Sequence, residues 1–165
     1  MTMEIQQLMW RIEAIRDTVH AAVFADGDVE TALTSLDAGC VFQTVAGSVG
    51  ATGIEDIRRF LTEDVVPHLP GDLAFRRVSK TSDQRRVTHE LIVTFTHDRE
   101  LPWLLPGIPP TGRTVSVNAV SIGSFRHTST LGHVTSRLTA YRIMWDRLDL
   151  LERLGVLDRL AAAKA

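Results

Sequence analysis

The N-terminal half of the chain carries apolar residues at helical spacing in two separate stretches. In the first stretch they fall at positions 5, 8, 9, 12, 15 and 19, which predicts a long amphipathic helix over residues 4–25. Asp28 follows a glycine and is expected to cap a short second helix. A third amphipathic helix is predicted over residues 54–65, before a proline ends it.

From about residue 72 the pattern changes to segments rich in Val, Ile, Thr and Phe, which is typical of strands. Four strands are predicted there, after an earlier one at 40–45, at residues 73–79, 86–96, 113–125 and 134–145. Residues 46–53 are expected to be a glycine-rich connector, and residues 126–133 a hairpin connection. Helices followed by consecutive strands indicate an α+β domain, with the helices on one face of a curved antiparallel sheet. One domain is expected over residues 1–158, with a tail at 159–165.

Composition limits the functional classes. The 165 residues suit a single domain, and a net charge of −2 gives no basic excess for binding nucleic acid. The single cysteine, Cys40, excludes an intrachain disulfide and a cysteine-rich zinc site, and the histidines lack metal-ligand spacing. No apolar run is long enough to cross a membrane, and the N-terminus does not resemble a secretory signal. These observations predict a cytoplasmic protein without a metal.

Three segments carry a resemblance to a known family. They are a strand ending in Thr-His at residues 89–97, a proline-rich loop at 102–113 that reads Gly-Ile-Pro-Pro-Thr-Gly-Arg at its end, and a terminal Trp-Asp segment at 145–155. Together they resemble the nuclear transport factor 2-like superfamily, specifically its SnoaL-like polyketide cyclase branch. The resemblance implies a strongly bent sheet forming a cone around three N-terminal helices, with an apolar pocket at the open end. It also implies a homodimer, and enzymes that need no cofactor.

Asp146 is the first candidate for catalysis, because the resemblance places an acid/base aspartate there, at the end of the last long strand. A carboxylate in an apolar pocket has a raised pKa and can exchange a proton next to a carbonyl group. The alternative is that Asp146 caps the C-terminal helix. Arg142 shares a strand face with position 146, and could hold Asp146 or polarise a substrate oxygen if that face is the inner one. Otherwise Arg142 lies on the outer face of the sheet.

Glu90 and His97 lie on one strand, seven residues apart, and therefore point to opposite faces if the strand is regular. His97 falls on the more apolar face and could reach the pocket rim as an acid, a base or a hydrogen-bond donor. The alternative is that His97 fixes the proline-rich loop. Glu90 is the second carboxylate that a hydrolytic reaction would need.

Four further residues are candidates for contact with substrate. Trp103 lies in the proline-rich loop, where an exposed Trp-Leu-Leu could form a lid or a dimer contact. Asn118 is a polar amide in mid-strand, and Tyr141 and Trp145 could line the cavity. Core packing is the alternative for each of them. The chain departs from the cyclase branch at Ser121, where that branch often has an acid.

The leading hypothesis is a small cofactor-independent enzyme. It would bind an apolar carbonyl, lactone or polyketide-like metabolite and catalyse isomerisation, cyclisation or elimination, with Asp146 as acid/base and His97 or Arg142 polarising an oxygen. One alternative is a catalytically silent ligand-binding or dimerisation module. Another is an epoxide or ester hydrolase that activates water.

Overall fold

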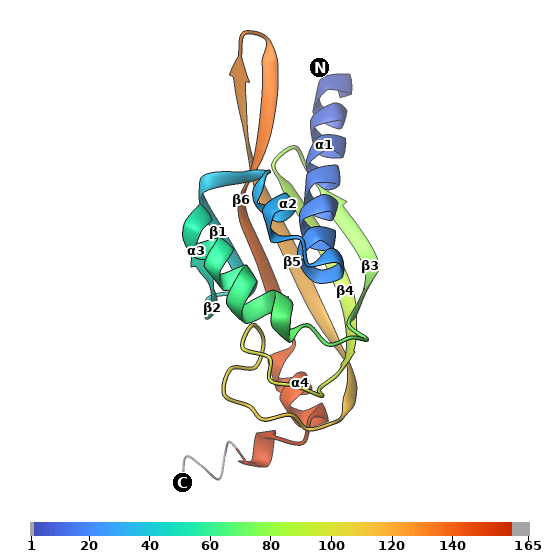
Figure 1. Cartoon of the computed structure of the whole chain (residues 1–165). Coiled ribbons are helices and arrows are strands. Elements are labelled where there is room, and N and C mark those ends of the chain that lie inside the picture. Colours follow the sequence, from blue (N-terminus) through green and yellow to red (C-terminus); the bar gives the residue numbers. More distant parts are fainter. Residues whose placement is uncertain (1, 160–165) are drawn as a thin grey trace.

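The computed structural model describes residues 2–159, and most of the expected tail lies outside them (Figure 1). The first helix, α1 (Thr2–Ala21), continues as one π-helical turn over Ala22–Asp26. The short α2 (Val29–Leu33) follows, and the Asp28 carboxylate accepts a hydrogen bond from the Thr31 amide at 3.1 Å, which confirms the predicted cap. The third helix, α3 (Ile54–Phe60), likewise continues through a π-helical turn to Val65.

The sheet has six strands in the order β2-β1-β6-β5-β4-β3. The strands are β1 (Leu36–Val45), β2 (Val49–Thr52), β3 (Ala74–Ser82), β4 (Arg86–Thr96), β5 (Thr114–Thr130) and β6 (His133–Trp145). The expectation of a wholly antiparallel sheet is wrong at one pair, because β1 runs parallel to β6. This pairing joins the first strand of the chain to the last.

Two segments that the sequence analysis expected to be connections form strands in the structure. Residues 49–52 of the expected glycine-rich connector form β2, which pairs with β1 at the edge of the sheet. Strands β5 and β6 also stay paired through the expected hairpin connection, from Arg126–Arg137 to Thr130–His133. A long two-stranded arm therefore projects beyond the sheet beside the N-terminal end of α1 (Figure 1).

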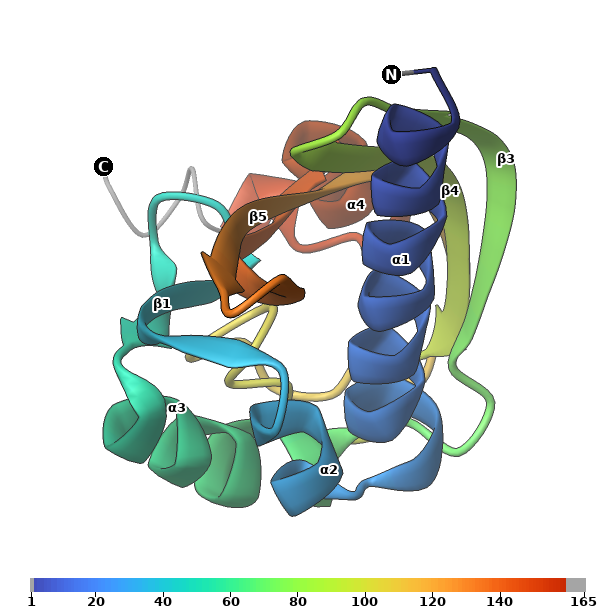
Figure 2. The ribbon, with the colours of Figure 1, turned by 90° about the horizontal axis from the view of Figure 1, so that it is seen from above.

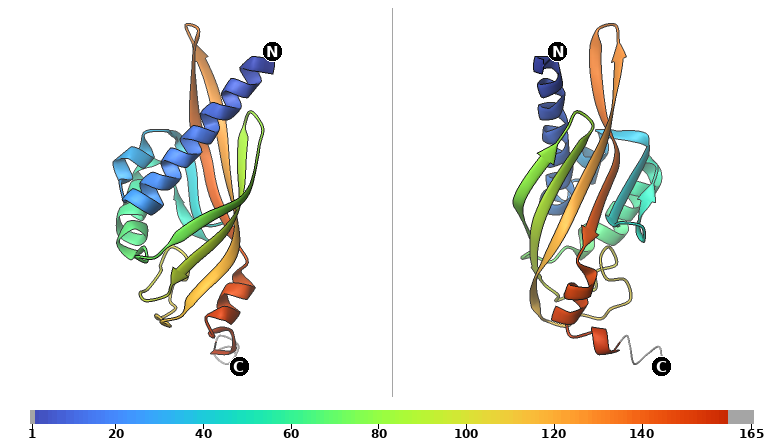
Figure 3. Two further views of the ribbon diagram at one scale, coloured as in Figure 1. Left: turned by 90° about the vertical axis from the view of Figure 1, so that its right-hand side faces the viewer. Right: turned by 180° about the vertical axis from the view of Figure 1, so that it is seen from behind.

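Helices α1, α2 and α3 lie on one side of the bent sheet, and the view from behind shows its other face (Figure 3). Seen from above, the sheet curves around the space that α1 and the shorter helices close (Figure 2). Burial alternates along the strands because of this layering: the odd-numbered residues of β4, and those of β5 up to Phe125, are buried, and the even-numbered ones are not. The fold is therefore the predicted α+β cone.

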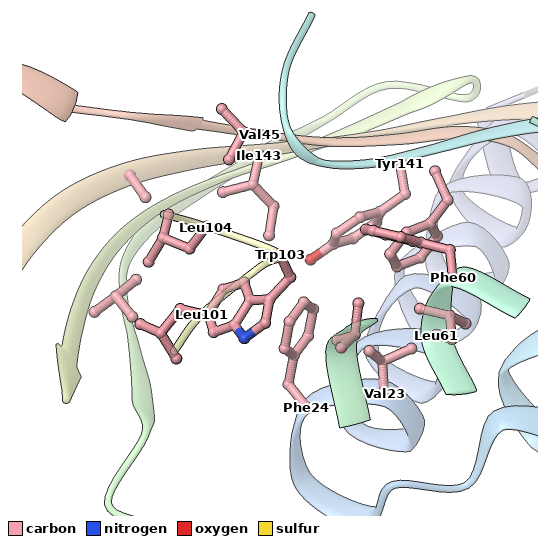
Figure 4. Packing of buried hydrophobic residues seen from close by; sticks show 14 of the residues in the cluster. Val23, Phe24, Val45, Phe60, Leu61, Leu101, Trp103, Leu104, Tyr141 and Ile143 are labelled. Atoms are coloured by element: carbon pink, nitrogen blue, oxygen red, sulfur yellow. The ribbon is translucent and has the colours of Figure 1, made fainter. Parts of the chain in front are cut away.

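The proline-rich loop closes the lower half of the cone from inside. Its residues Leu101, Trp103, Leu104 and Leu105 are all buried, and Figure 4 shows the Trp103 ring among Phe24, Tyr141 and Ile143. The expectation that Trp103 is an exposed lid or dimer contact is therefore wrong. Prolines stiffen a segment whose apolar side chains complete the core.

The last helix, α4 (Arg147–Arg153), covers the end of the sheet below this loop (Figure 1). Leu150, Leu151 and Leu154 bury its apolar side. Among the described residues, none of the helices is both long enough and apolar enough to span a bilayer.

Candidate active site

Polar side chains meet inside the cone between α1 and the inner face of the sheet. His89 of β4 and Ser121 of β5 are direct register partners, and Ser121 in turn faces Ile143 of β6. Arg16 and His20 reach this row from α1, where four-residue spacing puts them on one face of the helix. Two helical and several strand positions therefore converge on one polar cluster within an apolar core.

Arg16 is the charged centre of this cluster. Its side chain is largely buried, with 5% of the residue exposed, and Nη2 donates to the Ser121 hydroxyl at 3.0 Å. Nη1 pairs with the more exposed Asp17 carboxylate at 3.2 Å, and the guanidinium carbon lies 5.9 Å from the centre of the Tyr141 ring. The remaining nitrogen, Nε, is buried without a hydrogen-bond partner. Arg16 therefore brings a weakly compensated positive charge into the cone.

His20 and Tyr141 form the second part of the cluster. The Tyr141 hydroxyl lies 2.7 Å from Nδ1 of His20, at hydrogen-bonding distance. Burial, helped by the charge of Arg16, lowers the pKa of His20 to about 3, so its ring is neutral at physiological pH. Burial also raises the pKa of Tyr141, which keeps the hydroxyl protonated. The pair is thus an uncharged hydrogen-bonding unit.

His20 also lines a cavity that opens between the C-terminal end of α1 and the start of β3. This cavity has a volume of about 570 Å³, within the range of small-molecule sites. Its walls are mainly apolar and come from the end of α1, the loop before β3 and β3 itself: Ala21, Phe24, Ala25, Leu69, Pro70, Gly71, Leu73 and Phe75. The Phe75 ring meets the His20 ring edge-on at 4.5 Å between centroids. His20 is the titratable group among the lining residues, and we call this space the mouth cavity.

His89 is more deeply buried than His20 and does not line the mouth cavity. Only 3% of the residue is exposed, and its Nε2 is buried without a partner. Burial and the charge of Arg16 lower the pKa of His89 to about 4, so it too is neutral at physiological pH. Among the described residues, no three His, Cys, Asp or Glu side chains lie close enough together to hold a metal ion. The cluster therefore consists of neutral hydrogen-bonding groups around one cation, Arg16.

Asp146, the leading sequence candidate, lies elsewhere. It is exposed at the N-terminus of α4, and its carboxylate accepts a hydrogen bond from the Asp149 amide at 3.2 Å. This is the geometry of a helix cap, and it does not bring the carboxylate to the mouth cavity. Neighbouring Trp145 donates to the Thr44 carbonyl at 2.7 Å and lines a separate cavity of about 540 Å³ beside the β1–β2 hairpin.

Three other candidates lie on the outer face of the sheet. Arg142 pairs in register with Gln43 and Ile122 on that face. Its expected role, holding Asp146 or polarising a substrate oxygen, required the inner face and therefore does not apply. Glu90 is exposed and accepts a hydrogen bond from the Ser79 hydroxyl at 2.9 Å. Asn118 is exposed as well. None of the three side chains lines the mouth cavity.

His97 and Trp103 hold the proline-rich loop. His97 is buried, its Nδ1 lies 3.1 Å from the Thr111 hydroxyl, and its main chain pairs with Gly112 and Arg113. Trp103 donates from its indole nitrogen to the His68 carbonyl at 3.1 Å. These contacts correspond to the alternative interpretations, in which the two residues support structure. Of the predicted substrate contacts, Tyr141 is the one that reaches the polar cluster.

The sequence analysis missed Arg16, His20 and His89 and treated Ser121 only as a departure. A usable signal was present, because Arg16 lies on the buried stripe of α1 that Ile12 and Val19 define, and the half-buried His20 continues it. A charged or polar residue at a buried helical position is uncommon and points to a specific interior role.

Comparisons with solved structures agree with this architecture. TsrD from Streptomyces laurentii has 18% identity over 88% of this chain and 96% of its own, with a TM-score of 0.63. A protein from Shewanella denitrificans assigned to the SnoaL-like polyketide cyclases has 15% identity over 87% and 96%, with a TM-score of 0.63. The epoxide hydrolase/cyclase-like enzyme SalBIII has 15% identity over 85% and 94%, with a TM-score of 0.57.

At these identities the likeness concerns the fold alone: this chain shares the α+β cone of structures described as SnoaL-like polyketide cyclases. A scan against protein-family models gives no match, and a search of curated proteins gives none either. The cone fold supports many chemistries, so activity has to be argued from the site.

Proposed function

We propose that the protein is a small enzyme that binds an apolar organic carbonyl compound in the mouth cavity and promotes proton transfer next to the carbonyl. The observation that carries the proposal is the position of His20, with Nδ1 on the Tyr141 hydroxyl and the ring at an apolar, aromatic-walled cavity. An apolar cavity with one or two polar groups is the usual form of a small-molecule site. Solved structures with this fold that are described as SnoaL-like polyketide cyclases, and the epoxide hydrolase/cyclase-like enzyme SalBIII, support a small cyclase-type enzyme in general.

Within this proposal, loss of a proton from the carbon next to the carbonyl places negative charge on the carbonyl oxygen. A hydrogen bond aimed at that oxygen, in a site of low polarity, stabilises the developing enolate. The proton leaves to water at the open mouth, and the same step begins isomerisations, cyclisations and eliminations. His20 replaces Asp146 here as the group that contacts the ligand.

The proposal is tested with 1-tetralone, an apolar aromatic ketone, incubated with the protein in D2O. Proton NMR follows exchange of the hydrogens next to its carbonyl. We expect the wild type to accelerate exchange and the H20A variant to lose about 100-fold of the acceleration, the lower end of the range for one acid–base or hydrogen-bonding group. H133A removes an exposed histidine of the β5–β6 arm and is the matched control. Equal exchange with and without wild-type protein would refute the proposal.

A second candidate, a binding or dimerisation module without catalysis, is favoured by the buried loop. Trp103, Leu104 and Leu105 fill the lower half of the cone, which leaves less room for a ligand. This reading predicts binding of 1-tetralone without any acceleration of exchange, so the same experiment separates the two.

We also propose a homodimer formed through the outer face of the sheet. Ile92, Val120 and Ile122 are only partly buried on this face, and Met144 is 42% exposed. Sedimentation equilibrium of the wild type and of an I122E variant tests it. A dimer that dissociates in the variant is expected, and a monomeric wild type would contradict it.

A further inference from the structure

We propose that a directed chain of hydrogen bonds, from Arg16 through Ser121 and Tyr141, holds His20 as the tautomer that carries its hydrogen on Nε2. His20 then offers an N–H donor to the mouth cavity, and the ligand must present a hydrogen-bond acceptor, such as a ketone, lactone or quinone oxygen. The ligand class rests on the proposed function, whereas the tautomer is a property of the free protein.

The chain begins at a group whose direction is fixed. Arginine is always protonated and can only donate, so the 3.0 Å contact from Nη2 makes the Ser121 oxygen an acceptor. The Ser121 hydroxyl keeps its own hydrogen for another partner. The proposed chain sends this hydrogen to the Tyr141 oxygen, and hydrogen bonds from both Ser121 and Arg16 lower the pKa of Tyr141 against the larger effect of burial. The Arg16 guanidinium, which donates to Ser121, lies 5.9 Å from the centre of the Tyr141 ring.

The direction then passes to Tyr141. With Ser121 donating to the phenolic oxygen and the Arg16 cation beside the ring, the positive end of the O–H bond turns away from both. The acceptor on that far side is Nδ1 of His20, at 2.7 Å. Tyr141 therefore donates, and Nδ1 accepts with its lone pair.

The last step follows from the chemistry of imidazole. A neutral histidine has one N–H and one lone-pair nitrogen, so a ring that accepts at Nδ1 carries its hydrogen on Nε2. The ring is neutral because burial beside Arg16 and His89 disfavours the charged form. No hydrogen bond within the described chain occupies Nε2, and His20 lines the mouth cavity.

The arrangement makes the site electrophilic. A neutral imidazole N–H stabilises negative charge on a carbonyl oxygen by hydrogen bonding, and no covalent bond to the protein is formed. Arg16 and Ser121 do not touch the ligand in this scheme and act as positioning residues, since their contribution reaches the cavity through Tyr141 and His20.

The test is long-range proton–nitrogen correlation NMR of the ligand-free, nitrogen-15-labelled protein near neutral pH, with the His20 signals assigned by their loss in H20Q. We expect a pyrrole-type nitrogen at Nε2 and a pyridine-type nitrogen at Nδ1. A pyrrole-type Nδ1, or a doubly protonated ring, would overturn the proposal.

Variants then test the relay. Y141F removes the donor to Nδ1 and is expected to give a mixture of both tautomers, while the His133 signals stay unchanged. S121A is a smaller change and replaces Y141F in the test if Y141F does not fold. It is expected to shift the tautomer population in the same direction. A role confined to packing would leave the tautomer as it is in both variants. Failure of 1-tetralone to bind would contradict the proposed function and leave the tautomer result standing.

Discussion

Replacing Trp103 with alanine measures how far the proline-rich loop belongs to the core. The side chain is fully buried, its indole nitrogen donates to the His68 carbonyl, and its ring lies 5.9 Å from Phe24 and 6.3 Å from Trp145 between centroids. Truncating a buried tryptophan typically costs about 3–5 kcal/mol, from lost burial and from the cavity that remains. The His68 carbonyl also loses its partner, which places W103A toward the upper end of that range.

Urea unfolding followed by circular dichroism gives the free energy directly. In a chain of this size each kcal/mol moves the melting temperature by about 2–4 °C, so W103A is expected to melt roughly 6–20 °C below the wild type. W10A is the matched control, because Trp10 is 60% exposed and its loss should stay within about 0.5 kcal/mol. A cost below about 1.5 kcal/mol for W103A would refute the view that the loop is part of the core.

Three further predictions follow from the contacts described above. D146A is expected to lose about 1 kcal/mol of stability while D146N stays close to the wild type, because both Asp and Asn cap helices; equal unfolding curves for D146A and the wild type would contradict the cap. The free energy of unfolding should fall as the pH is lowered from about 7 to about 4.5. In the unfolded chain His20 and His89 take up protons below the ordinary histidine pKa, whereas in the folded chain their pKa values are about 3 and about 4. Urea midpoints across this range check the prediction, and H89Q should flatten the pH dependence whereas H133A should not. Cys40 is buried with its pKa raised to about 12, so Ellman's reagent should label one thiol per chain only in urea; rapid labelling of the native protein would be inconsistent with that burial.

The helices and most strands could be predicted because their signals are local. Apolar spacing located α1 and α3, and alternation located β4 to within its observed bounds. The parallel pairing of β1 with β6 joins residues about a hundred positions apart, such as Phe42 and Tyr141, and nothing in either segment specifies it. Strand β2 was missed because Gly50 and Ala51 have low strand propensity, and pairing with β1 supplies what propensity does not.

The site was harder to predict for the same reason. Asp146 follows the last long strand, as the resemblance required, but its side chain caps α4. Tyr141 was expected either to line the cavity or to pack in the core, and it is fully buried. Its partners Arg16 and His20 come from a helix whose contacts with the sheet depend on tertiary packing. A sequence pattern shows that a helical position is buried, and it does not show which strand residue it meets.

Glu13 anchors α1 to the edge strand of the sheet. Its carboxylate pairs with Lys80 at 2.9 Å and also accepts from the Ser82 hydroxyl, and both partners belong to β3. Arg16 and His20 lie about one and two turns further along the same helix, so a slide or rotation of α1 would carry both away from Ser121 and Tyr141 together. Ordering of the outermost strand and assembly of the interior relay are thereby mechanically linked, and slow exchange of β3 amides with solvent should accompany an intact relay.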